Sequence, residues 1–403
     1  MRPRNPIVVV IGTRPEYIKL APLVLCMRRN RMPVRVIFTG QHRELLDDVK
    51  DAFDVDCDRK LQVFKPGQRP GQMLARMVQQ IEQELRDCEA RFVVVQGDTC
   101  SALGGALAAT QLQIPVGHVE AGLRTEILFS PFPEEANRRL ISAISSLHFC
   151  ATKDAAQNLV REGVVATNIA ITGNTVVDAV YQTLRRIPFS AVERRERILV
   201  TMHRRENVDS GIENVARAIK RLVQSRPNLE VRWILHRNPK VRSKVTSILA
   251  TERQVHLLEP LSYQALLSEM KRAKLLLTDS GGLQEEAPAL NLPVGILRGE
   301  TEREEGVKAG CALLLGVEEN SIVQNIHALL NDEKRLQSMS RAKNPFGDGR
   351  ACQRIAWILC HRLGLPFLEE VEQTQNSQKS VAVASCHRAY RRADTARQIR
   401  RSM

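Results

Sequence analysis

The sequence predicts an α/β protein of two doubly wound domains with a ligand cleft between them. Short apolar runs alternate with segments of helical length along nearly the whole chain, and several of these runs are continuously apolar. Such runs are typical of parallel strands buried on both faces, and their alternation with helices is the pattern of βαβ units. The length of 403 residues also exceeds what one core usually supports.

Eleven runs are predicted as strands: Ile7–Ile11, Val34–Thr39, Phe92–Gln96, Val116–Glu120, His148–Ala151, Ile169–Thr172, Arg197–Thr201, Val231–Leu235, Val255–Leu258, Leu275–Thr278 and Pro293–Leu297. The charged, proline-containing segment LRRIPFSAVERRER interrupts this pattern near residue 190 and predicts a domain boundary there. We therefore expect Rossmann-like domains at 1–185 and 195–350. A helix in 351–370 is expected to pack back on the first domain, and 371–403 to form a disordered basic tail.

Composition and charge restrict the partners that we expect. The hydrophobic fraction of 43% fits a soluble globular protein, and no apolar run is long enough for a membrane span. From Lys379 onward, seven Lys or Arg residues stand against one acid, so this tail supplies six of the fourteen net positive charges. The rest fits a diphosphate ligand. We expect a cytoplasmic protein that binds neither nucleic acid nor membrane.

The loop after the first predicted strand reads GTRPEYIKLAPL and has the features of an anion site. Gly12 permits a tight turn, Pro15 suits the first turn of a helix, and Arg14 and Lys19 add two cations there. The loop lacks the G-x-G-x-x-G fingerprint, and no tyrosine is followed four positions later by lysine. The sequence therefore favours an enzyme without a nicotinamide cofactor, and we expect neither a cofactor nor a metal.

Three acids are candidates for proton transfer. Asp98 and Glu120 end or follow two buried strands, and Glu134 follows Pro133 at the start of a predicted helix. Carboxylates gathered at one sheet edge repel one another unless a ligand or cation neutralises them. Such a group can divide the roles of acid and base, although the sequence leaves open which residue has which role.

The second half carries two histidines after predicted strands. His203 lies in Met202-His-Arg-Arg-Glu-Asn and suits binding or protonation of a phosphate leaving group. His236 lies in Leu235-His-Arg-Asn-Pro, where a structural and a functional role are equally consistent with the pattern.

The loop from Thr278 to Pro288 is the clearest nucleotide-binding candidate. Its glycines, Gly281 and Gly282, would let backbone N–H groups of the following helix approach phosphate. Glu286 suits ribose hydroxyls, and Arg303 adds a cation from the next loop.

Taken together, these motifs resemble the non-hydrolysing UDP-N-acetylglucosamine 2-epimerases. The resemblance extends from about Val8 to Leu368 and rests on the segments GTRPEYIKLAP, TGQHRELL, QGDT, PVGHVEAGLRT, SPFPEEANRRL, ITGNTVVDA, VTMHRREN, DSGGLQEEAP, TEREE and NPFGDGRA. It implies two Rossmann-like domains similar to those of GT-B glycosyltransferases, a UDP-sugar substrate and a homodimer. Two departures bear on nucleobase affinity: Glu304 replaces a proline beside Arg303, and Leu266 stands where some members have Phe.

The resemblance also implies roles for individual residues. It assigns the reaction centre to Arg14, Lys19, Asp98, Glu120, Glu134 and His203. It assigns UDP binding to Arg14, Lys19, His203, Ser280, Gly281, Gly282, Glu286 and Arg303. It suggests a second, regulatory UDP-GlcNAc site at Gln41, His42, Arg205 and His236.

The implied activity is reversible epimerisation at C2, through elimination of UDP to a 2-acetamidoglucal and its re-addition, supplying N-acetylmannosamine for cell-surface polysaccharide. Four alternatives remain open. They are a hydrolysing 2-epimerase that releases free N-acetylmannosamine, an epimerase of a UDP-diacetamido sugar, a GT-B glycosyltransferase and a non-catalytic sensor. Retention of three acids and His203 argues against the sensor, because negative charge weakens the binding of a diphosphate.

Overall fold

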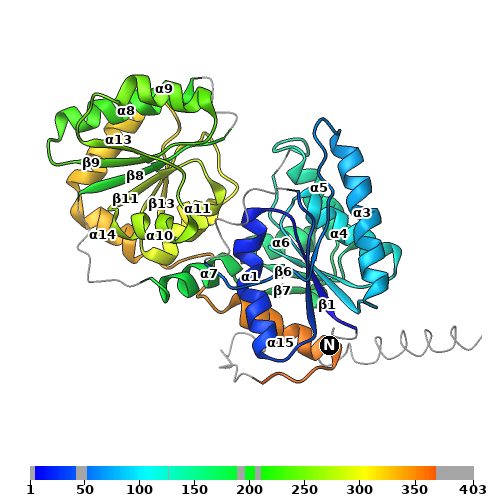
Figure 1. The fold of residues 1–403 in the computed structure, drawn as a ribbon. Helices are drawn as coiled ribbons and strands as arrows, with labels where there is room; N and C mark the ends of the chain where they lie inside the picture. The colour runs from blue at the N-terminus through cyan, green and yellow to red at the C-terminus, as the bar shows by residue number, and fades with distance from the viewer. Residues whose placement is uncertain (1–4, 42–51, 126, 188–195, 205–209, 369–403) are drawn as a thin grey trace, which may run out of the picture.

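The computed structural model describes residues 5–41, 52–125, 127–187, 196–204 and 210–368. Two parallel β-sheets, each covered by helices, dominate the molecule (Figure 1). We call the part around the first sheet the first lobe and the part around the second sheet the second lobe. The predicted α/β class with two doubly wound parallel sheets is confirmed.

The first sheet has the strand order β3-β2-β1-β4-β5-β6-β7. Its strands are β1 (Ile7–Ile11), β2 (Val34–Phe38), β3 (Arg59–Lys60), β4 (Phe92–Gln96), β5 (Val116–Val119), β6 (Leu147–Cys150) and β7 (Ile169–Ile171). The second sheet has the order β10-β9-β8-β11-β12-β13. Its strands are β8 (Arg197–Thr201), β9 (Glu230–Ile234), β10 (Val255–Leu258), β11 (Leu275–Thr278), β12 (Val294–Ile296) and β13 (Ala312–Leu314).

All eleven predicted strands are present, with ends shifted by one residue at several positions. Two strands were not predicted. β3 has only two residues, both charged and exposed, and β13 is a three-residue strand at the edge of its sheet. Neither is long enough to show a period of burial, which is the signal that a strand prediction needs.

The two sheets repeat one topology. In each, the strand that comes first along the chain lies between the second and the fourth, so the order reverses between β1 and β4 and between β8 and β11. Ile7, for example, is in register with Val34 on one side and with Phe92 on the other. Ligands of such sheets bind beyond the carboxyl ends of the strands at this reversal, which makes the loops after these four strands the first place to search.

Helices cover both sheets. The first lobe contains α1 (Arg14–Arg29), α3 (Pro70–Asp87), α4 (Cys100–Gln111), α5 (Glu134–Ile144), α6 (Lys153–Arg161), the 3-10 turn η2 (Ala166–Asn168) and α7 (Thr175–Leu184). The second lobe contains α8 (Gly211–Ser225), α9 (Pro239–Leu249), α10 (Tyr263–Arg272), α11 (Gly281–Glu286), η4 (Ala287–Leu290), α12 (Glu304–Lys308), α13 (Glu319–Asn331) and α14 (Glu333–Arg341). The last helix among the described residues, α15 (Ala351–Leu363), lies beside α1 of the first lobe (Figure 1).

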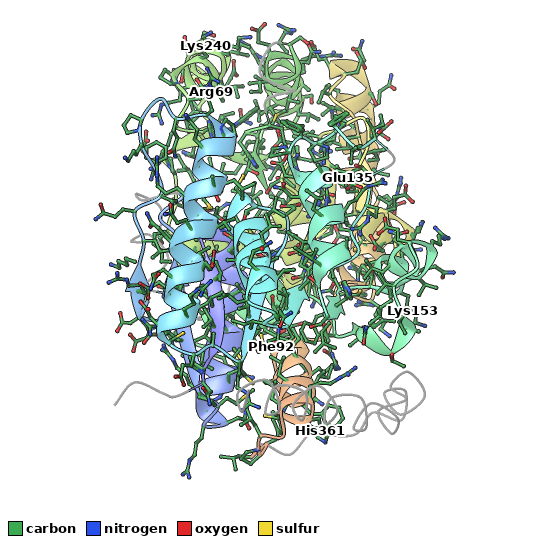
Figure 2. All side chains as sticks on the ribbon, turned by 90° about the vertical axis from the view of Figure 1, so that its right-hand side faces the viewer. Arg69, Phe92, Glu135, Lys153, Lys240 and His361 are labelled. Carbon is green, nitrogen blue, oxygen red and sulfur yellow. The ribbon has the colours of Figure 1, made fainter. Side chains whose placement is uncertain are left out.

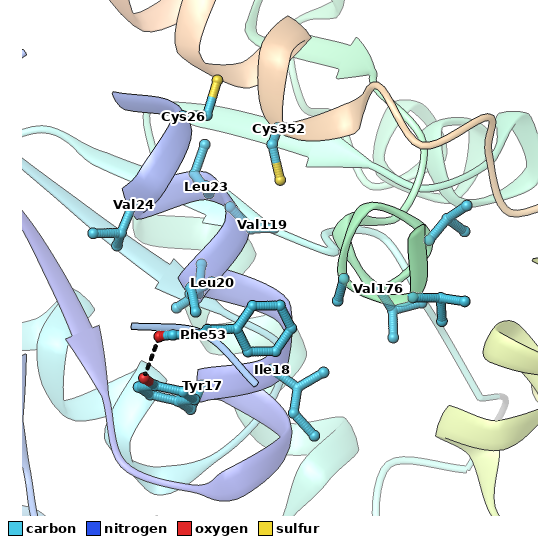
Figure 3. Close-up of a cluster of buried hydrophobic side chains, with 14 of the residues drawn as sticks. Tyr17, Ile18, Leu20, Leu23, Val24, Cys26, Phe53, Val119, Val176 and Cys352 are labelled. Carbon is cyan, nitrogen blue, oxygen red and sulfur yellow. Dashed lines mark hydrogen bonds between the residues drawn. The ribbon is translucent and has the colours of Figure 1, made fainter. Parts of the chain in front are cut away.

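Local sequence explains why α1 begins directly after the first strand. The Thr13 hydroxyl accepts a hydrogen bond from the Glu16 amide, which satisfies one of the free N–H groups of the first turn. Pro15 occupies the first turn, where its missing N–H costs nothing. The buried face of α1 then packs with α7 and α15 in a core that includes Tyr17 and Cys352 (Figure 3).

Asp178 connects α7 to α15. Its carboxylate accepts hydrogen bonds from the backbone amides of Ala351 and Cys352, at 3.1 and 3.0 Å, and so caps the N-terminus of α15. The domain limits 1–185 and 195–350 stay a prediction, since 188–195 lie outside the described residues. The predicted tail 371–403 also lies outside them. Within the parts that the structure describes, no helix is both long and apolar enough to cross a bilayer.

Candidate functional site

The side chains of the two lobes meet in a buried cluster of ion pairs at the sheet reversals. The Lys19 ammonium group, on α1, lies 2.7 and 2.6 Å from the two carboxylate oxygens of Glu120, which follows β5. The same ammonium lies 3.0 Å from Glu285 of α11 in the second lobe. Lys19 therefore contacts one carboxylate from each lobe.

Arg303 extends this cluster from the second lobe. Its Nε lies 3.0 Å from Glu285, one terminal nitrogen lies 2.7 Å from Glu302, and the other lies 3.9 Å from Glu120. Burial works against the charge of Arg303, but the carboxylates of Glu285, Glu302, Glu120 and Asp98 outweigh it and raise the pKa. Two cations and several acids thus share one water-poor space.

The environment separates the pKa values of the two carboxylates that share Lys19. Burial raises the pKa of Glu120 above its ordinary value, although Lys19 counteracts this effect. Burial acts on Glu285 as well, but Lys19 and Arg303 together outweigh it and lower its pKa. The surroundings thus favour the ionised form of Glu285 more strongly than that of Glu120.

Glu120 is also held in an unusual backbone conformation. Its φ is +63°, in the left-handed region that side chains other than glycine rarely adopt. The side-chain amide of Gln96, the last residue of β4, donates a further hydrogen bond to its carboxylate. Backbone strain of this kind persists where the surrounding contacts fix a functional geometry.

The loop that carries Asp98 is fixed from three directions. The His118 ring, on β5, hydrogen-bonds the Gly97 carbonyl at 2.8 Å, and burial lowers the pKa of this histidine to about 3, so the ring is neutral and donates. Asn137, on α5, donates to the Asp98 carbonyl at 2.8 Å. The Thr99 hydroxyl donates to Glu16 at 2.6 Å. Three elements of the first lobe thus position this one acid.

Helix α5 brings a buried arginine to the same edge. Glu135, at its start, lies toward the end of the lobe opposite Phe92, the first residue of β4 (Figure 2). The guanidinium of Arg138 lies 3.2 Å from Glu135 and 3.7 Å from Asp98. Its three nitrogens are buried without a hydrogen-bond partner among the described residues, as is one carboxylate oxygen of Glu134. These groups can still bind a polar ligand.

In the second lobe, Asp279 positions the histidine loop after β8. Its buried carboxylate accepts hydrogen bonds from the backbone amides of His203 and Arg204, and lies 3.3 Å from His203 Nδ1. The exposed ring of His203 stacks on that of His236, with ring centroids 6.2 Å apart. Asp279, directly after β11, thereby holds the backbone of the loop that follows the neighbouring strand β8.

The glycine loop lies directly beside Arg303. A Cβ atom added to Gly281 would lie 2.7 Å from the Arg303 guanidinium, so only glycine leaves room for that side chain as it stands. Ser280 occupies the N-cap position of α11 without a side-chain capping hydrogen bond. A Cβ added to Gly282 would lie 3.9 Å from the Glu286 carboxylate, an ordinary contact distance. Burial raises the pKa of Glu286 to about 8, and one of its oxygens is buried without a partner among the described residues.

The structure thus brings together Lys19, Glu120, Arg303 and the Gly281 loop, with Asp98 nearby. Arg14 reaches across to the second lobe and donates to the Leu261 carbonyl at 3.3 Å. Of the predicted regulatory residues, Gln41 is bound to Ser101 of α4, and His236 lies beside His203. His42 and Arg205 lie outside the described residues, so the regulatory site stays a prediction.

The sequence did not single out Glu285, Asp279 or Gln96. Asp279 follows a buried strand directly and could have been found by the strand-end rule that identified Asp98. Glu285 and Glu286 are adjacent on one short helix, so which of the two carboxylates faces Lys19 could not be decided from the sequence. Among the described residues, no group of three or more His, Cys, Asp or Glu side chains is arranged to hold a metal ion.

This chain is similar to known proteins across both lobes. Residues 25–360 match the family model described as UDP-N-acetylglucosamine 2-epimerase. An Escherichia coli O157:H7 protein of that name is 42% identical over 364 residues, covering 87% of this chain and 96% of the relative. A Thermotoga maritima protein, named putative UDP-N-acetylglucosamine 2-epimerase, is 43% identical over 368 residues, covering 88% and 96%.

Two solved structures give the same result for the fold. The Neisseria meningitidis UDP-GlcNAc 2-epimerase bound to UDP-GlcNAc matches with a TM-score of 0.83 and 38% identity, covering 88% of this chain and 99% of that one. The Staphylococcus aureus MnaA–UDP co-structure matches with a TM-score of 0.84 and 39% identity, covering 90% and 98%. Each of these two proteins has a uridine nucleotide bound.

Proposed function

Because this chain belongs to the UDP-N-acetylglucosamine 2-epimerase family, we propose that it interconverts UDP-N-acetylglucosamine and UDP-N-acetylmannosamine without hydrolysing them. The observation that carries the proposal is the contact of Lys19 with Glu120 and Glu285 at the edges of both sheets. It combines a proton-exchanging carboxylate with the cations that a diphosphate needs.

The reaction that this arrangement supports is an elimination followed by an addition. A first-lobe carboxylate takes the proton from C2, the C–H electron pair forms the C1–C2 double bond, and the C1–O bond breaks with its electrons on UDP. Re-addition returns the UDP oxygen to C1 and a proton to the other face of C2. Asp98, Glu120 and Glu134 are the proposed proton carriers, and the raised pKa of Glu120 favours it as one of them.

Departure of UDP requires stabilisation of negative charge, and cations at the site are suited to this. We assign this role to Arg14, Lys19, His203 and Arg303, with the Ser280–Gly282 loop at the start of α11. Glu286 is the proposed partner of the ribose. Bringing the lobes together would exclude water, which otherwise competes for the intermediate and yields free sugar.

The remaining assignments follow from the family resemblance. We propose that the chain acts as a homodimer, that 1–185 and 195–350 are its domains, and that its product is a source of N-acetylmannosamine for cell-surface polysaccharide. Gln41, His42, Arg205 and His236 remain the proposed regulatory UDP-GlcNAc site.

Incubation of the purified full chain with UDP-GlcNAc, followed by NMR of the products, tests the proposal. The expected products are UDP-N-acetylmannosamine and residual substrate, with the same mixture reached from either epimer. Release of UDP and free N-acetylmannosamine as the main products would instead identify a hydrolysing enzyme. Turnover restricted to a UDP-diacetamido sugar in a parallel incubation would reassign the substrate.

A further inference from the structure

Glu285 belongs to the second lobe but contacts a residue of the first. One of its oxygens lies 3.0 Å from the Lys19 ammonium, and the other lies 3.0 Å from Arg303 Nε. Its side chain is 4% exposed. Glu285 is therefore a buried carboxylate that joins a first-lobe cation to a second-lobe cation.

The fold places Glu285 at this position through α11. This helix begins in the glycine loop after β11 and packs on α7, next to α1, where Lys19 resides. The adjacent acid, Glu286, makes neither of these ion pairs, and one of its oxygens is buried without a partner among the described residues. The two consecutive glutamates thus have different surroundings.

We propose that Glu285 is a positioning residue for the reaction, which holds the Lys19 ammonium against Glu120 when the two lobes meet. This inference rests on the proposed epimerase function. Lys19 is the residue through which Glu285 acts, because the carboxylate of Glu120 contacts Lys19 at 2.6 Å while Glu285 contacts it from the opposite lobe. Correct placement of the catalytic ammonium then depends on contact between the lobes, so turnover and lobe closure are linked.

A purely structural role for Glu285 would be to neutralise Arg303 within its own lobe. Glu302 provides the matched control, since it lies 2.7 Å from Arg303 in the same lobe and its side chain is also buried. The ion pairs of Lys19 are with Glu120 and Glu285 instead. Replacing either glutamate by glutamine removes one partner of Arg303. Only the replacement of Glu285 removes a partner of Lys19. In Glu285→Gln each cation keeps one carboxylate, Glu120 for Lys19 and Glu302 for Arg303, which favours folding of the variant.

The experiment compares kcat and KM for UDP-GlcNAc in the wild-type chain, E285Q and E302Q. A displacement of about 1 Å in a catalytic group costs on the order of a hundredfold in rate, so E285Q should lower kcat by roughly that factor. E302Q should act mainly on KM through Arg303. In a Lys19→Met background, E285Q should change kcat by less than about twofold, because the two residues act as one unit.

A double-mutant cycle that measures stability tests the contact between Lys19 and Glu285 independently of turnover. Thermal unfolding should show coupling of about tenfold in the unfolding equilibrium constant between K19M and E285Q, and clearly weaker coupling between K19M and E302Q. A wild-type kcat in E285Q, or equal effects of E285Q and E302Q on kcat, would overturn the inference. Absence of coupling in the stability cycle would overturn it as well. Failure of the wild-type chain to epimerise UDP-GlcNAc would count against the proposed function, and the stability cycle would still decide whether Glu285 and Lys19 interact.

Discussion

The ammonium group of Lys19 lies within 2.7 Å of both carboxylate oxygens of Glu120. The pair is buried, and Glu120 adopts a positive φ at the end of β5 while Gln96 contacts its carboxylate. In the proposed reaction, the substrate diphosphate would bring a second set of anions to the same cation. The contact with Lys19 therefore stabilises the Glu120 carboxylate in its strained position. A bound anion would also compete with Glu120 for Lys19, which would change the pKa of Glu120.

Replacement of Glu120 by glutamine should lower kcat for epimerisation by on the order of a hundredfold or more, since the amide has the same shape but cannot take up a proton. Steady-state kinetics at saturating UDP-GlcNAc measure this. The matched control is Glu82→Gln, at a half-buried glutamate of α3 that pairs with the exposed Arg86. That variant should retain wild-type kinetics. Normal turnover in E120Q with a normal melting profile would remove Glu120 from the mechanism.

Replacement of Gly281 by alanine should weaken binding of the UDP-sugar. The added Cβ would lie 2.7 Å from the Arg303 guanidinium, which is buried and bound to Glu285 and Glu302. Overpacking of this kind costs about 1–3 kcal/mol, which corresponds to a rise in KM of roughly fivefold to a hundredfold if it falls on substrate binding.

Gly299→Ala is the control for this change, because an added Cβ there meets nothing within 4 Å. Calorimetric titration with UDP separates loss of nucleotide affinity from loss of turnover. Equal affinities of G281A and G299A for UDP would show that Arg303 does not need the space beside Gly281.

His148 should make stability sensitive to mild acid. It is buried in β6, in register with the equally buried His118 of β5, and burial lowers its pKa from the ordinary 6.5 to about 4. The unfolded chain therefore takes up a proton near pH 6.5 while the folded chain does not, so stability is lost as pH falls through this range. Between pH 7 and pH 5 this residue should cost about 2 kcal/mol.

The comparison of wild type with His148→Gln isolates this effect from the buried acids Glu16 and Glu286, whose raised pKa values act in the opposite direction. Urea unfolding at pH 7 and pH 5 should show a smaller loss of stability for H148Q than for wild type. His256→Gln, at an exposed histidine of β10, should follow the wild-type chain. Identical losses in wild type and H148Q would mean that His148 is protonated in the folded state.

The sequence predicted the sheets because most strands are buried on both faces and appear as continuous apolar runs, such as Ile7–Ile11. It also placed Asp98 and Glu120 at or directly after strand ends, and Lys19 in the segment that follows the first strand. It did not predict their pairing. The contact of Lys19 with Glu120 and Glu285 depends on where three separate elements come together, and no local spacing encodes that. The hydrogen bonds of His118, Asn137 and Glu16 to the Asp98 loop were not predicted, for the same reason.

Solvent isotope incorporation tests the central claim most directly, namely that first-lobe carboxylates exchange the proton at C2 of a UDP-sugar. The full chain should be incubated with UDP-GlcNAc in D2O and the sugars followed by NMR. We expect deuterium at C2 of both the substrate and the product epimer, since each passage through the unsaturated intermediate replaces that proton. Epimer formation with the C2 proton fully retained, or no exchange at any position, would contradict the account.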